Sequence, residues 1–126
     1  MLAPALGNMA RFRTRSEGSD RRADLTMVLQ VTEAIDRALK ASKSERDGLG
    51  RRVSDALSRA AMLVGNGTDE YTERETADTS RLRKYEAEIA NGQRRLDHLD
   101  YAIGQFERLK AELMASFSSV LSTHKH

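Results

Sequence analysis

The stretch that decides the fold is residues 82–106, which read LRKYEAEIANGQRRLDHLDYAIGQF. Its apolar residues recur in alternating steps of three and four, with Gly92 filling one step: Leu82, Tyr85, Ile89, Leu96, Leu99, Ile103 and Phe106. This spacing places them at the core positions, a and d, of a heptad repeat on one helix face. The same spacing continues to Val120, so the sequence predicts a helix over about residues 70–122 that packs against another helix.

The first half of the chain carries a matching heptad pattern. Its core positions are Leu25, Val28, Thr32, Ile35, Leu39, Ser42, Arg46, Leu49, Val53, Ala56, Ala60 and Leu63. Gly48 and Gly50 lie inside this run, and each costs about 1 kcal/mol relative to alanine in a helix. Because the heptad phase passes through them without a slip, we expect one continuous helix over about residues 24–64. A kink or break at Gly48–Gly50 is the alternative.

Residues 65–69 read GNGTD and separate the two patterns. Gly65 suits the left-handed residue that often closes a helix. A connection this short makes the two helices antiparallel neighbours, so the sequence predicts an all-α, coiled-coil-like antiparallel hairpin. Folding about this turn pairs core residues whose numbers sum to about 138, which sets Arg46 opposite Gly92. A register shifted by one layer is the alternative.

The composition agrees with long helices and limits the possible chemistry. Of the 126 residues, 39% are hydrophobic and 32% are charged, which favours a narrow helical core over a large globular one. The absence of cysteine excludes disulfides and thiolate metal sites. Residues 1–22 contain Pro4, Gly7 and Gly18 and are predicted to be a flexible, basic tail. We expect a cytoplasmic protein.

The sequence shows no pattern typical of an enzyme. His98 falls at an outward-facing c position, and neither Glu-x-x-His nor His-Glu-x-x-His occurs. No glycine-rich phosphate loop follows a predicted strand. We therefore expect no catalytic residue, no cofactor, no metal site and no small-molecule substrate.

Two helices alone leave apolar side chains uncovered beside the core and at the C-terminal end. The residues predicted to bind a partner are Leu29, Leu57, Val64, Leu109, Phe117 and Leu121. Such a surface favours self-association into a homodimer that forms a four-helix bundle, or binding of another protein. The general shape resembles the small helical-hairpin chaperones and stalk-binding proteins of bacterial export systems. The leading hypothesis is therefore a coiled-coil interaction, assembly or chaperone-like adaptor protein.

An alternative hypothesis rests on arginines. The residues that it assigns to anion binding are Arg11, Arg13, Arg15, Arg51 and Arg52. Clustered arginine can bind the phosphates of a nucleic acid or an anionic membrane surface. The near balance of 21 basic and 19 acidic residues does not by itself require such a partner.

Overall fold

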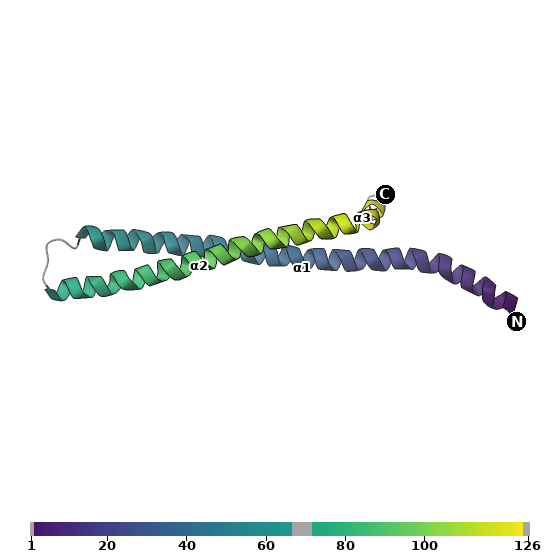
Figure 1. Cartoon of the computed structure of the whole chain (residues 1–126), viewed down its shortest axis with the longest axis horizontal. Coiled ribbons are helices and arrows are strands. Elements are labelled where there is room, and N and C mark those ends of the chain that lie inside the picture. The colour runs from purple at the N-terminus through teal and green to yellow at the C-terminus, as the bar shows by residue number, and fades with distance from the viewer. Residues whose placement is uncertain (1, 67–71, 125–126) are drawn as a thin grey trace. The chain divides into compact units, whose positions relative to one another are not determined.

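The computed structural model describes the backbone of residues 2–66 and 72–124, and the side chains of residues 17–65 and 76–122. Within these ranges the chain is all-α and contains no strand. It forms α1 (Leu2–Asn66), α2 (Thr72–Ser116) and α3 (Ser118–His124). The two long helices pack against each other as a helical hairpin (Figure 1), which confirms the predicted fold class.

The hairpin consists of two compact units. Unit 1 comprises Met1–Ala38 and Phe106–His126, and unit 2 comprises Leu39–Gln105. Each unit therefore holds a segment of α1 beside an antiparallel segment of α2, and α3 belongs to unit 1.

The predicted core positions are the positions at which the helices pack. Every one from Leu25 to Leu63 is buried or half-buried, and so is every one from Leu82 to Leu113. The prediction fails at the next core position, because Phe117 is 37% exposed, whereas Val120 is half-buried. The most buried apolar side chains are Val28 in unit 1 and Leu39, Val53, Ala56, Leu99 and Ile103 in unit 2. Burial of one large apolar side chain contributes about 1.5–3 kcal/mol relative to its exposure.

The pairing of the two helices differs from the prediction by one heptad. A Cβ atom built at Gly92 would overlap Val53 Cγ2 and lie 3.7 Å from Leu49 Cδ1. Gly92 therefore faces Leu49 and Val53, and the prediction that it faces Arg46 is wrong. Core residues pair where their numbers sum to about 145, instead of about 138.

Local contacts at several core positions agree with the observed pairing. The predicted register sets large residues opposite each other, such as Val53 opposite Tyr85. The observed register sets Val53 against Gly92, and Ala56 and Tyr85 line one groove. It also brings acidic partners to two cations at core positions. Arg46 reaches Asp100 in unit 2, and Lys110 reaches Asp36 in unit 1.

α1 is longer than predicted and is not broken at its glycines. The helix continues through Gly48 and Gly50, so the prediction of one continuous helix is confirmed. It begins at Leu2 and also covers residues that the prediction assigned to the tail. Pro4 lies in the first turn, where its missing N–H would have no helical partner in any case. That residues 1–22 are flexible stays a prediction.

The predicted turn lies partly outside the described residues, because residues 67–69 are not described. Gly65 and Asn66 still belong to α1, and no described glycine has a positive φ. The prediction that Gly65 takes the left-handed closing conformation is therefore wrong. Gly65 keeps helical dihedral angles because the helix extends one residue beyond it.

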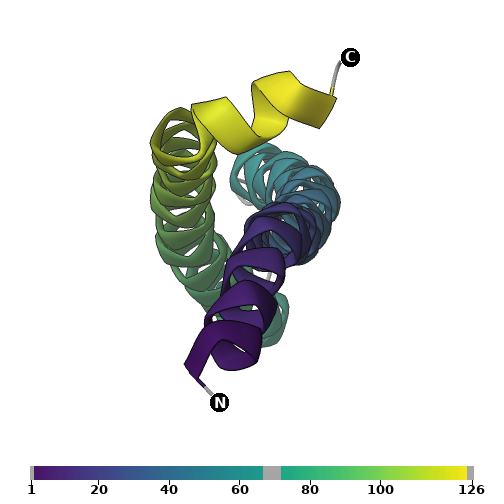
Figure 2. The ribbon, with the colours of Figure 1, turned by 90° about the vertical axis from the view of Figure 1, so that its right-hand side faces the viewer.

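The single second helix that the sequence predicts is interrupted at Phe117. The backbone N–H of Phe117 donates to the carbonyl of Leu113 at 3.1 Å, and that of Leu121 donates to Phe117 at 3.0 Å. Helical hydrogen bonds thus remain while the chain changes direction, and α3 runs across the end of α2 (Figure 2). Serines surround this point, and the Ser122 hydroxyl donates to the Ser119 carbonyl. Serine side chains compete for backbone groups and so weaken a helix.

Candidate functional site

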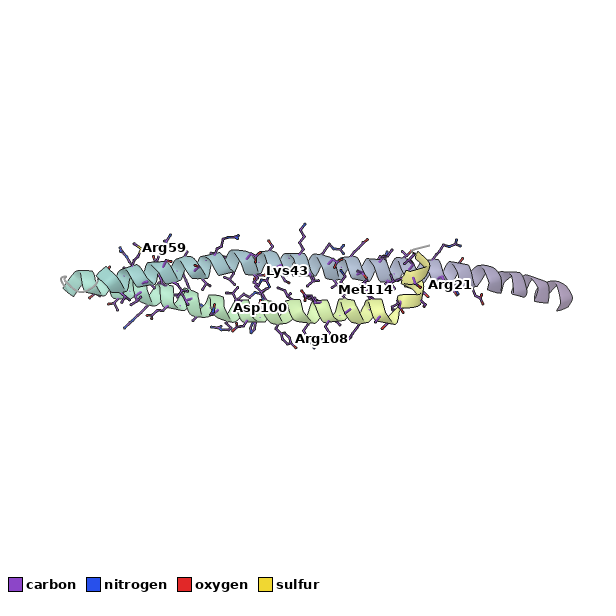
Figure 3. The ribbon with its side chains drawn as sticks, turned by 90° about the horizontal axis from the view of Figure 1, so that it is seen from above. Arg21, Lys43, Arg59, Asp100, Arg108 and Met114 are labelled. Atoms are coloured by element: carbon purple, nitrogen blue, oxygen red, sulfur yellow. The ribbon has the colours of Figure 1, made fainter. Side chains whose placement is uncertain are left out.

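Ion pairs line both flanks of the core in unit 2. The guanidinium of Arg95 donates to both carboxylate oxygens of Glu45, at 2.7 and 2.9 Å. This hydrogen bonding lowers the pKa of Glu45 and raises the pKa of Arg95. On the opposite flank, Arg46 Nη1 lies 3.5 Å from Asp100 Oδ1. Lys43 and Asp100 are labelled on the two helices in Figure 3.

The Glu45–Arg95 pair borders a shallow groove of about 610 Å³ in unit 2. Its lining residues are Glu45, Leu49, Arg52, Val53, Asp55, Glu88, Asn91, Gly92 and Arg95. Three carboxylates and two guanidiniums share this space, so their charges offset one another. The groove therefore lacks the single sign of charge that concentrates an ionic ligand.

A second groove in unit 2, of about 370 Å³, shows the same mixture of charges. It is lined by Asp55, Ala56, Arg59, Arg81, Lys84, Tyr85 and Glu88. A hydrogen bond to Tyr85 and the nearby carboxylate of Asp55 raise the pKa of Arg59. Arg59 Nε lies 3.0 Å from Asp55 Oδ2. The guanidinium of Arg59 is therefore already paired with side chains of the same chain.

The residues predicted to bind anions are not assembled into one basic patch within the described part of the chain. Arg51 and Arg52 are both exposed in unit 2, but Arg52 lies in the groove beside carboxylates. The side chains of Arg11, Arg13 and Arg15 lie outside the described residues. Binding of a nucleic acid or an anionic membrane therefore stays a prediction.

Four flank positions of unit 1 carry exposed apolar side chains. On α1, Leu29 is 37% exposed and Val31 is 47% exposed. On α2, Leu109 is 51% exposed and Met114, labelled in Figure 3, is 43% exposed. In the observed register, the e positions of Leu29 and Met114 face each other on one flank. The g positions of Val31 and Leu109 face each other on the other flank. The helices of unit 1 are also joined by an ion pair between Lys110 and Asp36 at 2.8 Å.

The structure divides the predicted partner-binding residues between the two units. Leu29, Leu109 and Phe117 are exposed in unit 1, and Leu121 is half-buried there. Leu57 and Val64 are exposed in unit 2. Whether any of them binds a partner stays a prediction.

Sequence reasoning missed three exposed apolar residues of unit 1, namely Met27, Val31 and Met114. The signal that could have identified two of them is a second heptad spacing. Met27 and Val31 begin a run with steps of four, three and four beside the core positions of α1. Met114 occupies the same e position in its heptad as Leu121.

His98 is exposed in unit 2, as its c position predicts. Among the described residues, no three histidine or acidic side chains gather in a way that could hold a metal ion. The described helices also contain no segment with the length and apolarity needed to cross a membrane.

Both units thus carry ion pairs and exposed apolar side chains beside the core, but their g positions differ. Glu45 and Arg95 form an ion pair there in unit 2, whereas Val31 and Leu109 are exposed there in unit 1. Comparison of the chain with protein-family models, curated proteins and solved structures finds no match in any of the three.

Proposed function

We propose that the chain is a coiled-coil assembly protein that binds another helix through the apolar flanks of unit 1. The observation that carries this proposal is the exposure of Val31 and Leu109, which occupy g positions in unit 1. The equivalent g positions in unit 2 hold the Glu45–Arg95 ion pair. Apolar side chains at flanking positions widen a helix face beyond what one partner helix covers. In this proposal the role is binding, without catalysis.

The contrast between these two pairs of positions supports this assignment on energetic grounds. An exposed ion pair keeps a helix flank hydrated and contributes little to stability. A leucine on the same flank gains free energy only when a further apolar surface covers it, at about 25 cal/mol per Å². A partner helix that covers Leu109 and Val31 provides such a surface.

A photo-crosslinking residue tests the proposal when it replaces Leu109 in the full chain inside living cells. We expect defined adducts, either with a second copy or with another protein. The matched control replaces Tyr101, which is 70% exposed on α2 but lies away from the flanks. The Leu109 adducts should also disappear when the same chain carries Val31→Glu. Equal yields at positions 109 and 101 would contradict the proposal.

A further inference from the structure

α1 carries a second apolar stripe within unit 1, which consists of Met27, Val31, Ala34 and Ala38. The steps of four, three and four repeat the spacing of the core positions, so the four residues form a continuous strip along the helix. Met27 is 54% exposed and Val31 is 47% exposed. Ala34 is exposed and Ala38 is half-buried.

A helix with two such stripes is typical of a bundle in which it contacts two neighbours. In unit 1, α2 covers the first stripe, where Val28 is only 3% exposed. The second stripe stays exposed among the described residues. It contains no charged residue, and its two alanines allow the backbone of another helix to approach closely.

We propose that this second stripe packs antiparallel on the second stripe of another copy of the chain. The inference rests on the proposed assembly function and names its partner. The sizes of the side chains support an antiparallel copy, because two larger residues precede two alanines along the strip. Antiparallel pairing sets Met27 against Ala38 and Val31 against Ala34, so a large residue meets a small one at each level. Parallel pairing sets Met27 against Met27.

Charges at the two ends of the stripe favour the same arrangement. Asp24 continues the stripe at its N-terminal end, and Arg37 borders it near its C-terminal end. An antiparallel copy brings Asp24 of one chain within about one helical turn of Arg37 of the other, twice by symmetry. A parallel copy brings like charges together at both ends. The same surface thus supplies both halves of a self-complementary interface.

Single cysteines test this pairing in a chain that has no cysteine of its own. Copies that carry Val31→Cys are mixed with copies that carry Ala34→Cys and are then treated with a short bismaleimide. We expect the product that joins position 31 to position 34 to outweigh both same-residue products. A mixture of Met27→Cys and Ala38→Cys should likewise give mainly the product that joins position 27 to position 38. Predominance of same-residue products, or no product at all, would overturn the antiparallel pairing.

Sedimentation of the full chain separates this inference from the proposed function. We expect a dimer that Ala34→Arg weakens roughly tenfold or more, because the arginine would have to leave water inside an apolar contact. Ala90→Arg is the matched control, since Ala90 is an exposed alanine of α2 in unit 2. Circular dichroism checks that both variants stay helical. A wild-type monomer, or a dimer that Ala34→Arg leaves intact, overturns the self-pairing. Adducts from position 109 with another protein would still support the assembly function.

Discussion

At Gly92 the backbone of α2 lies directly against α1. A Cβ atom there would overlap Val53 Cγ2, and Val53 is a buried, β-branched residue with little rotamer freedom in a helix. We therefore expect Gly92→Ala to destabilise the chain by about 1–3 kcal/mol, although alanine has the higher helix propensity. The midpoint of urea unfolding measures this change.

Gly104 supplies the matched control, because nothing lies within 4 Å of a Cβ atom built there. Gly104→Ala should stabilise the chain by about 0.5–1 kcal/mol through helix propensity alone. Val53→Ala should remove most of the effect of Gly92→Ala in a double variant. Stabilisation by both glycine substitutions would show that α1 and α2 do not meet closely at Gly92.

Between the two helices, the Glu45–Arg95 pair makes the stability of the hairpin depend on pH. The hydrogen bonds from Arg95 lower the pKa of Glu45 below its value in the unfolded chain, which is about 4.3. The stabilisation is therefore complete above pH about 4.3 and is lost as the pH falls through the lower folded pKa. We expect that the melting temperature of Glu45→Gln falls less steeply than that of the wild-type chain as the pH is lowered.

The same substitution in an Arg95→Gln background gives the control for this pairing. In the Arg95→Gln background, Glu45→Gln should change the pH dependence of the melting temperature very little. The reason is that Arg95 provides the hydrogen bonds that lower the pKa of Glu45. An equal change in both backgrounds would mean that Glu45 responds to other groups. Melting curves followed by circular dichroism over a series of acidic buffers provide the comparison.

The helices of this chain could be predicted from the sequence, whereas their alignment could not. Heptad spacing is local, so it identified core positions from Leu25 to Leu63 and from Leu82 to Leu113 that are all buried or half-buried. The register of α1 against α2 depends instead on contacts between residues far apart in the sequence. The predicted pairing set Gly92 against Arg46, whereas in the structure Gly92 lies against Val53 and Lys110 forms an ion pair with Asp36. The interruption at Phe117 has no heptad signal, because core spacing continues through it.

For the whole molecule, the candidate surface could be predicted only in part. Leu29 and Leu109 were identified because they lie beside core positions, and both are exposed. Val31 and Met27 were missed because the second stripe lies at c and g positions, outside the a and d positions that define the core. The contrast between Val31 and Leu109 in unit 1 and the Glu45–Arg95 pair in unit 2 depends on which residues the observed register sets opposite each other. Heptad spacing alone does not supply that register.

The unfolding of the whole chain should therefore depend on protein concentration. If two copies bury their second stripes, a folded dimer unfolds to two monomers, and mass action stabilises it by about 1.4 kcal/mol for each tenfold rise in concentration. We expect the melting temperature of the wild-type chain to rise with concentration and that of Ala34→Arg to rise less. Calorimetry over a hundredfold range of roughly micromolar concentrations measures both. A wild-type melting temperature that stays constant would mean that the stripe is covered by a different protein or by none.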